Sequence, residues 1–260
     1  MSPGASEATG KTEAASAERP RPALSPSRAA DFKQCPLLYR FRAVDRLPEP
    51  PSTAQLRGSV VHAALEQLYG MPAADRGPQT ALSLVDPAWD RVLAEHPDLA
   101  DGFTDEQRIE VELADGTLLR GYVDRIDVAG TGELRVVDYK TGKAPPAARA
   151  LAEFKALFQM KFYAVALLRS RDVLATRLRL IYLADGQLLD YTPELDELLR
   201  FEKTLMAIWR AIQSAGATGD FRPNPSKLCN WCSHQALCPA YGGTPPPYPG
   251  WPEKLGEPAA

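Results

Sequence analysis

The sequence lacks a long uninterrupted apolar segment. Nothing in its 260 residues approaches the roughly 18 consecutive apolar residues that a membrane-spanning helix requires. The first 20 residues are rich in Ala, Ser and Glu and contain no apolar stretch of the kind found in signal peptides. We therefore expect no membrane partner and a cytoplasmic location.

An excess of positive charge is also missing. Lys and Arg total 30 against 33 Asp and Glu, which gives a formal net charge of −3. This balance argues against a protein that coats nucleic acid through bulk charge. An acidic site that holds a metal ion is compatible with it, because bound metal neutralises carboxylates.

A complete P-loop is absent as well. Gly10-Lys11-Thr12 resembles the end of the motif G-x-x-x-x-G-K-[ST], but the preceding glycine, Gly4, lies one residue too far away and no strand leads into it. The chain therefore carries no nucleoside-triphosphate motor, and any ATP-driven step must come from a partner.

The 24 prolines are concentrated toward the two ends of the chain. Residues 1–22 contain few bulky hydrophobic residues, and residues 242–260 are rich in Pro and Gly, so we expect two disordered tails around one domain, residues 23–241. Tyr248 and Trp251 leave open a docked segment within the second tail.

Hydrophobic periodicity between the tails predicts an α/β or α+β domain. Apolar residues recur at helical spacing in some segments, while alternating residues and Asp-Gly turns mark strands in others. Expected helices are a short one ending near Gln34 and segments 54–69, 80–95, 147–169 and 193–215; expected strands are 109–113, 118–128, 134–140, 177–183 and 188–191. This order predicts a mixed central sheet flanked by helices.

Asp138 and Lys140 are unusual within a mostly apolar strand. Side chains alternate along a strand, so these two face one side while Val137 and Tyr139 face the other. Burying them costs several kcal/mol per ion unless they are paired or bound to metal. An ion pair at a sheet edge is one interpretation. The other includes Asp124 on the neighbouring strand, which would complete a site for a cation that prefers oxygen ligands.

Two carboxylates and a lysine in this arrangement suit phosphodiester hydrolysis. The cation would polarise the phosphodiester and lower the pKa of a bound water. Lys140 would then orient that water or stabilise the charge that develops on the phosphate.

Four motifs, in order along the chain, resemble the RecB-type branch of the PD-(D/E)xK nuclease superfamily. They are G-x-x-x-H ending at His62, G-x-x-D-R-x-D with Asp124, D-Y-K-T-G with Asp138 and Lys140, and Q-x-x-x-Y with Gln159 and Tyr163. The resemblance covers about residues 24–240. Val123 stands where the superfamily's name implies proline, a departure that the RecB branch tolerates.

The resemblance implies a restriction-endonuclease-like core and a Mg²⁺- or Mn²⁺-dependent deoxyribonuclease. It implies an exonuclease that acts on single strands or DNA ends in repair or recombination, with a helicase as a partner. The residues that the resemblance assigns are Asp124, Asp138 and Lys140 as catalytic, His62 as a further metal ligand, and Gln159 and Tyr163 near the active site and DNA. Taken singly, His62 would be a core residue, and Gln159 and Tyr163, four apart on one helix face, would be surface residues.

The four cysteines form a second constellation. Cys35 is distant from the others, which follow the pattern C-x2-C-x5-C at Cys229, Cys232 and Cys238. In a cytosolic protein this clustering favours metal over disulfides. Tetrahedral zinc and an iron–sulfur cluster both use four thiolates, and His234 inside the triplet keeps zinc open.

One distant cysteine followed by a C-terminal triplet resembles the arrangement in AddB and in the CRISPR-associated exonucleases. The resemblance implies a [4Fe–4S] cluster, with structural Zn²⁺ as the alternative. Either metal would tie the two ends of the domain together.

Two other functions fit the same motifs. One is a catalytically weak nuclease-fold module that binds DNA, and the other is a metal-stapled scaffold that docks a helicase. The presence of His62, Asp124, Asp138 and Lys140 argues against the first.

Overall fold

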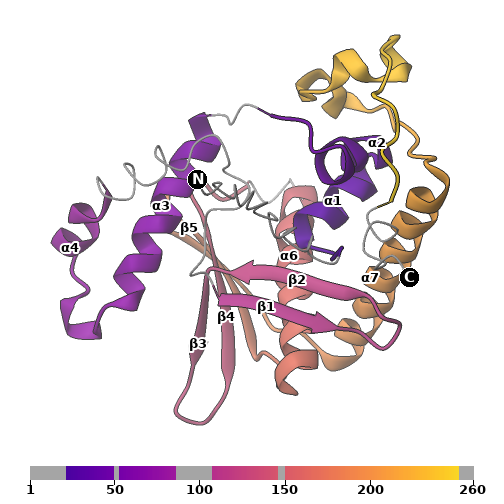
Figure 1. Cartoon of the computed structure of the whole chain (residues 1–260). Helices are drawn as coiled ribbons and strands as arrows, with labels where there is room; N and C mark the ends of the chain where they lie inside the picture. Colours follow the sequence, from indigo (N-terminus) through magenta and orange to yellow (C-terminus); the bar gives the residue numbers. More distant parts are fainter. Residues whose placement is uncertain (1–21, 50–52, 86–106, 146–149, 252–260) are drawn as a thin grey trace, which may run out of the picture.

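The computed structural model of the chain describes residues 22–49, 53–85, 107–145 and 150–251 (Figure 1). Its strands are β1 (Gln107–Glu112), β2 (Leu118–Val123), β3 (Arg125–Val128), β4 (Leu134–Lys140), β5 (Arg177–Tyr182) and β6 (Gln187–Tyr191). Its α-helices are α1 (Pro26–Gln34), α2 (Pro36–Tyr39), α3 (Thr53–Gly70), α4 (Pro78–Ser83), α6 (Ala150–Arg171) and α7 (Leu195–Thr218). Short helical turns are η1 (Arg40–Val44), η2 (Ala73–Asp75), η3 (Lys227–Trp231), η4 (Gln235–Leu237) and η5 (Pro239–Tyr241).

The expected mixed sheet is confirmed. Four strands lie in the order β3-β4-β5-β6, with β4 and β5 parallel and the other two pairs antiparallel. A parallel pair needs a long crossover, which α6 provides between β4 and β5. β1 and β2 form a separate antiparallel hairpin, whose turn has Gly116 at φ +82°. The expected helix 80–95 is described only at its start, since α4 ends at Ser83 and residues 86–106 lie outside the described part.

The single strand expected over residues 118–128 is wrong, because the chain leaves the hairpin at Asp124 and continues as β3. β2 pairs with β1, whereas β3 pairs with β4. At the break, the Asp124 carboxylate accepts a hydrogen bond from the Tyr139 backbone N–H at 2.7 Å. A side chain thus replaces a backbone acceptor there, which hydrophobic alternation cannot reveal.

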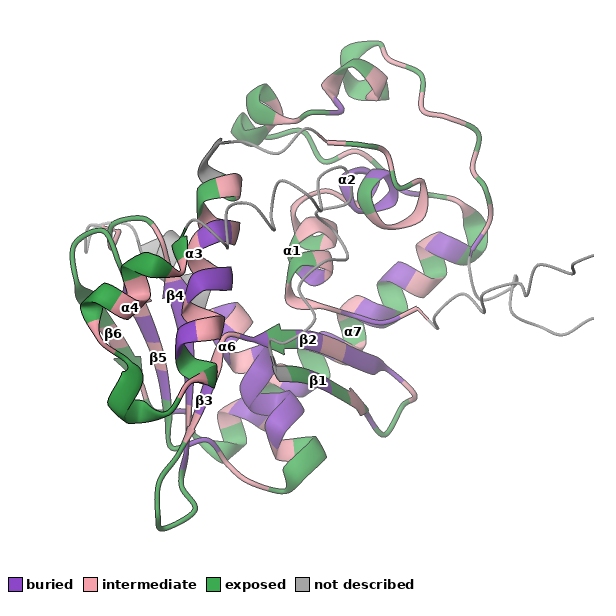
Figure 2. Cartoon of the chain, turned by 60° about the vertical axis from the view of Figure 1, so that its left-hand side comes forward, coloured by how far each residue is buried: buried purple, intermediate pink, exposed green. Residues whose placement is uncertain are grey.

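Helix α6 lies at the centre of the molecule. It packs against the hairpin, against β4 and β5, and against α7. Its residues from Phe162 to Leu167 are all buried, so this part of the helix is apolar around its whole circumference (Figure 2). Helix α7 instead buries one stripe at helical spacing, which includes Leu198, Leu205 and Trp209.

The N-terminal segment (α1, α2 and η1) and the C-terminal segment (the described residues after α7) lie side by side above the sheet (Figure 1). Asn224 Nδ2 donates to the Gln34 carbonyl at 2.9 Å, and Leu37 N donates to the Arg222 carbonyl at 3.3 Å. Arg40 Nη2 donates to the Pro246 carbonyl at 2.5 Å. Hydrogen bonds from protein groups alone therefore already hold the two segments together.

Part of the second expected tail packs against α7. Trp251 is only 6% exposed and its ring lies 6.2 Å from that of Trp209. The Tyr248 hydroxyl donates to the Gly216 carbonyl at 2.5 Å. Gly216 permits the close approach of Trp251 to α7, because a Cβ at this position would lie 2.3 Å from the Trp251 ring. The segment with Tyr248 and Trp251 is therefore docked, a possibility that the sequence left open. Residues 1–21 and 252–260 lie outside the described part.

Within the residues that the structure describes, no helix is both long enough and apolar enough to span a bilayer.

Candidate active site

Asp124 and Asp138 face one another across β3 and β4. The last antiparallel pair is Arg125 with Val137, so extending the register by one residue sets Asp124 opposite Asp138. Asp138 lies in β4 and is 2% exposed, whereas Asp124 at the end of β2 is partly exposed. The topology thus brings together two carboxylates that are separated in the sequence.

Helix α3 brings His62 to the same place. His62 Nδ1 lies 3.4 Å from Asp124 Oδ1, while the other oxygen of that carboxylate accepts from Tyr139 N. The helix also passes close to the end of β4, since a Cβ at Gly58 would lie 3.9 Å from Thr141 Oγ1. The G-x-x-x-H helix and the D-Y-K-T-G strand are therefore neighbours.

Lys140 connects Asp138 to the Q-x-x-x-Y motif on α6. Its Nζ lies 2.6 Å from Asp138 Oδ2 and donates to Gln159 Oε1 at 3.1 Å. Gln159 Nε2 in turn donates to the Tyr163 hydroxyl at 3.0 Å. Gln159 therefore orients the lysine, and Tyr163 orients Gln159. Because Tyr163 is only 4% exposed, its geometry supports a positioning role rather than direct contact with DNA.

The environment of Asp138 disfavours its charged form. Burial raises the pKa of this carboxyl from 3.8 to about 6, with a further upward contribution from Asp124, although Lys140 and His62 act in the opposite direction. Its Oδ2 is buried and has no partner in hydrogen-bonding geometry among the described residues, despite the nearby lysine. A buried carboxylate oxygen that lacks a hydrogen bond is a suitable donor for a hard cation.

Asp127 has a different role. It lies opposite Arg135 on β4 and forms ion pairs with Arg135 at 2.6 Å and with Arg125 at 2.9 Å. These pairs fix the β3–β4 edge, so the contacts of Asp127 indicate a structural role.

Gly121 allows α6 to approach the hairpin closely. A Cβ at this position would lie 2.8 Å from Tyr163 Cε1, so the tyrosine ring fills the space that a side chain would occupy. The glycine of the G-x-x-D motif therefore helps to place the Tyr163–Gln159–Lys140 chain of hydrogen bonds.

We expect Gly121→Ala to destabilise the protein by about 1–3 kcal/mol, the usual range for overpacking a core, and to lower the nuclease activity that the motifs predict, because Tyr163 and Gln159 shift. Denaturant unfolding and a cleavage assay measure the two effects. Gly130→Ala is the matched control, since its added Cβ has nothing within 4 Å. Unchanged stability and cleavage in Gly121→Ala would contradict this role.

Sequence reasoning missed part of the site. A hollow, here called the active-site hollow, is lined by His62, Leu65, Glu66, Tyr69, Asp124 and Tyr139. Glu66 and Tyr69 follow His62 by four and seven residues, a spacing that places all three on one face of α3. That helical spacing was the available signal.

The four cysteines line a second hollow between the N- and C-terminal segments. Cys35 Sγ accepts from Asn224 N at 3.4 Å, and Cys229 Sγ accepts from Ser226 N at 3.3 Å. The Ser226 N–H is the main cause that lowers the pKa of the Cys229 thiol, whereas burial raises that of Cys232. Backbone N–H donors to sulfur are also found around iron–sulfur clusters.

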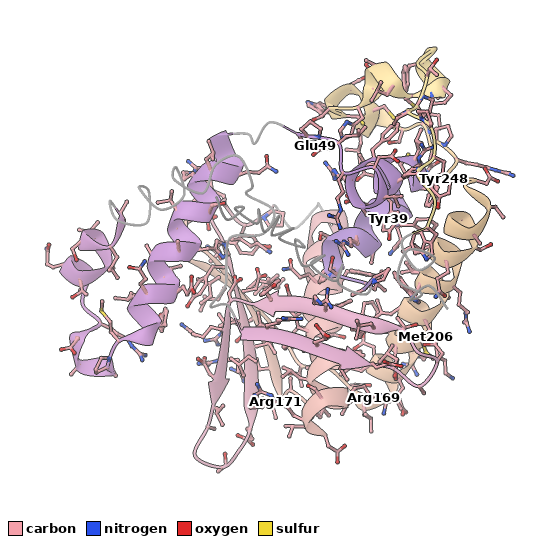
Figure 3. All side chains as sticks on the ribbon, viewed as in Figure 1. Tyr39, Glu49, Arg169, Arg171, Met206 and Tyr248 are labelled. Carbon is pink, nitrogen blue, oxygen red and sulfur yellow. The ribbon has the colours of Figure 1, made fainter. Side chains whose placement is uncertain are left out.

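His234 lies in the same region but is already engaged. Its side chain is 4% exposed, and its Nε2 lies 2.6 Å from Glu49 Oε1. Arg42 links Glu49 to Asp31, with contacts of 2.8 Å and 2.6 Å respectively. Glu49 thus joins η1, through Arg42, to the C-terminal segment, through His234 (Figure 3). Zinc binding through His234 Nε2 would therefore require this contact with Glu49 to break.

Neither hollow holds a preassembled metal site. In the described ranges, no three His, Cys, Asp or Glu residues are placed together as they would be around a metal ion. The donor chemistry fits nevertheless, with carboxylates and an imidazole at one place and thiols at the other. Metal binding would therefore require side-chain rotation, above all of the Asp138–Lys140 pair.

Comparison with known proteins covers the residues that carry the four motifs. The sequence profile described as the PD-(D/E)XK nuclease superfamily matches residues 23–239. Gene 69 protein of Mycobacterium phage L5 is 29% identical over 141 residues, which are 52% of this chain and 44% of that protein. The alignment therefore spans less than half of this curated relative.

Two solved structures are similar to this chain. One, described as a "Putative exonuclease" from Eubacterium rectale, has a TM-score of 0.50 and 14% identity, covering 82% of this chain and 87% of that chain. The other, described as SSO0001, has a TM-score of 0.42 and 17% identity, covering 82% of this chain and 85% of that chain. At 14% identity, the likeness to the Eubacterium rectale protein concerns the fold alone.

Proposed function

Because the chain belongs to the PD-(D/E)XK nuclease superfamily, we propose that it is a Mg²⁺- or Mn²⁺-dependent deoxyribonuclease that acts on single strands or DNA ends. The observation that carries the proposal is the convergence of Asp124, Asp138 and Lys140, with His62 beside them, on one partly exposed site. These residues come from α3, the β2–β3 break and β4.

The metal ligands would be His62, Asp124 and Asp138. The burial of Asp138 supports this assignment, because a buried carboxylate needs a positive partner, and a metal ion could take over that role from Lys140, which lies 2.6 Å away. When bound, the metal supplies Lewis acidity toward the phosphodiester and an activated water.

Lys140 would hold the nucleophilic water or the phosphate oxygen. Its bond to Gln159 at 3.1 Å keeps the ammonium group in place if Asp138 turns toward the metal. The Tyr163 hydroxyl fixes the Gln159 amide, so the lysine is positioned before substrate arrives.

A cleavage assay on end-labelled single- and double-stranded DNA tests the function. We expect cleavage with Mg²⁺ or Mn²⁺, no cleavage with EDTA, and a loss of at least about a hundredfold in Lys140→Ala. Lys143→Ala is the matched control, because it removes an exposed lysine three residues away. DNA binding without cleavage under all conditions would instead favour the catalytically weak module.

We further propose that Cys35, Cys229, Cys232 and Cys238 hold a [4Fe–4S] cluster, with structural Zn²⁺ as the alternative. Support comes from the shared hollow and from the backbone N–H groups directed at Cys35 and Cys229. The cluster would reinforce the hydrogen bonds that already join the N- and C-terminal segments.

A role in repair or recombination with a helicase partner is part of the same proposal. The chain has no P-loop, so unwinding of duplex substrates would depend on another protein. Exposed apolar side chains beside the cysteines, Leu228, Trp231 and Tyr241, offer a surface for such a contact. A metal-stapled scaffold would retain partner binding while lacking metal-dependent cleavage.

A further inference from the structure

Tyr69 lies at the rim of the active-site hollow, where no sequence motif places it. It follows His62 by seven residues on α3, which corresponds to two helical turns and about 10 Å along the helix axis. Its side chain remains 37% exposed although it belongs to the same hollow as Asp124. An accessible aromatic ring thus lines the same hollow as His62 and Asp124, two of the three proposed metal ligands.

The ring belongs to an ordered stack. Tyr69 and Tyr139 are stacked, with ring centroids 6.2 Å apart and planes inclined by 23°. The Arg125 guanidinium carbon lies 4.5 Å from the Tyr69 ring centroid and 5.5 Å from that of Tyr139. Arg125 is itself fixed, because it donates to the Tyr139 hydroxyl at 2.5 Å and pairs with Asp127 at 2.9 Å. The side chains of the stack therefore lose little further conformational entropy when a ligand binds.

Arg76 adds positive charge at the same point. Its guanidinium carbon lies 5.3 Å from the Tyr69 ring centroid, and the side chain is exposed. It donates to the Met71 carbonyl at 2.9 Å and to the Tyr69 carbonyl at 3.1 Å. These carbonyl oxygens orient the guanidinium without neutralising its charge, so the rim is suited to an anionic ligand with a flat ring.

The Tyr69–Tyr139 stack is also linked to the proposed catalytic carboxylates through the backbone of β4. Tyr139, whose ring faces Tyr69, lies between Asp138 and Lys140 on β4, and its backbone N–H binds Asp124. Tyr139 is therefore the residue that links a ligand ring stacked on Tyr69 to Asp124.

A nucleotide has the chemistry that this rim accepts. Each base presents a π face that stacks on aromatic rings and guanidinium planes, largely regardless of sequence. Inside a duplex both faces of a base are covered by its neighbours, whereas an unpaired base can expose one. We propose, on the premise of the nuclease function above, that Tyr69, with Arg76 and Arg125, stacks the base of an unpaired nucleotide beside the scissile phosphate.

Tyr69→Ala on intact and abasic substrates tests the proposal. A single abasic residue is moved through the nucleotides that flank the cleavage site of a single-stranded oligonucleotide. We expect Tyr69→Ala to lower kcat/KM by about 5- to 150-fold, the range for losing one base stack. At one position the abasic substitution should lower wild-type kcat/KM similarly, yet cause no further loss in Tyr69→Ala. Tyr69→Trp should retain activity on the intact strand.

Tyr122→Ala is the matched control, because Tyr122 is 39% exposed on β2 and lies outside the hollow. It should keep the full abasic effect. If Tyr69→Ala loses the same factor on intact and abasic strands, the ring only supports Tyr139 structurally, and the stacking proposal is wrong. If wild type cleaves nothing, the nuclease proposal fails; fluorescence anisotropy with the same oligonucleotides then decides on stacking, which is contradicted if Tyr69→Ala binds intact strands as tightly as wild type does.

Discussion

Asp138→Asn is expected to abolish cleavage and to stabilise the metal-free protein. The loss of activity should reach at least about a thousandfold, because the variant removes a negatively charged ligand from the proposed cation site. The gain in stability follows from burial, which makes the ionised carboxylate costly: the pKa of Asp138 is raised to about 6. A neutral amide of the same shape avoids that cost.

The pH dependence has a definite sign. Between about pH 4 and pH 6 the folded protein binds the Asp138 proton while the unfolded chain, whose carboxyl has the ordinary pKa of 3.8, has released it. The free energy of unfolding of the metal-free wild type should therefore fall as pH rises through this window. Asp138→Asn lacks this slope, so its advantage should be near zero at pH 4 and reach about 1–3 kcal/mol at pH 7.

Denaturant unfolding in EDTA at several pH values measures the stability effect. Asp190→Asn is the matched control, since it removes an exposed aspartate that pairs with Arg179 at 2.6 Å on β5 and β6. That variant should retain cleavage and lose at most about 1 kcal/mol. An Asp138→Asn protein that cleaves like wild type would refute the site, and one that is less stable at pH 7 would refute the account of its burial.

Cys232→Ser is expected to remove a bound metal and to loosen the C-terminal segment. If four thiolates hold one cluster, Cys35→Ser should have an equal effect although the two residues are 197 positions apart. The destabilisation should amount to several kcal/mol, because metal binding contributes directly to folding. The hydrogen bonds between the segments, such as Asn224 to Gln34, remain, so we expect local opening rather than complete unfolding.

Anaerobic purification, metal analysis and visible absorption test this expectation, and limited proteolysis between residues 222 and 241 detects the opening. Ser233→Ala is the matched control, since Ser233 is an exposed residue next to Cys232. A colourless wild-type protein that contains zinc would contradict the iron–sulfur cluster and support the structural zinc. A wild type with neither metal would make both proposals for the cysteines wrong.

The sequence was most informative where structure depends on local periodicity. Strands β4, β5 and β6 and helices α3, α6 and α7 lie close to the segments that apolar spacing predicted. The sequence also predicted that Asp124 and Asp138 lie on adjacent strands, and the antiparallel register of β3 and β4 places them opposite one another.

Features that involve distant residues were inaccessible to this reasoning. The break between β2 and β3 arises because Asp124 binds the backbone N–H of Tyr139, fifteen residues away. Tyr163 is buried because Gly121, on another element, leaves room for its ring. The sequence left open a docked segment at Trp251, but it did not show that its partner is Trp209 on α7. Each outcome is a packing relation between segments, which composition and spacing do not encode.

The sequence by itself determined the order of elements, the chemical types in the site and the absence of a P-loop. Only the tertiary structure decided how those types are used. It paired Lys140 with both Asp138 and Gln159, engaged His234 with Glu49, and brought Tyr69 beside Tyr139. The physical reason is that a side chain's role depends on burial and on its neighbours in space, and both are set when distant segments pack together.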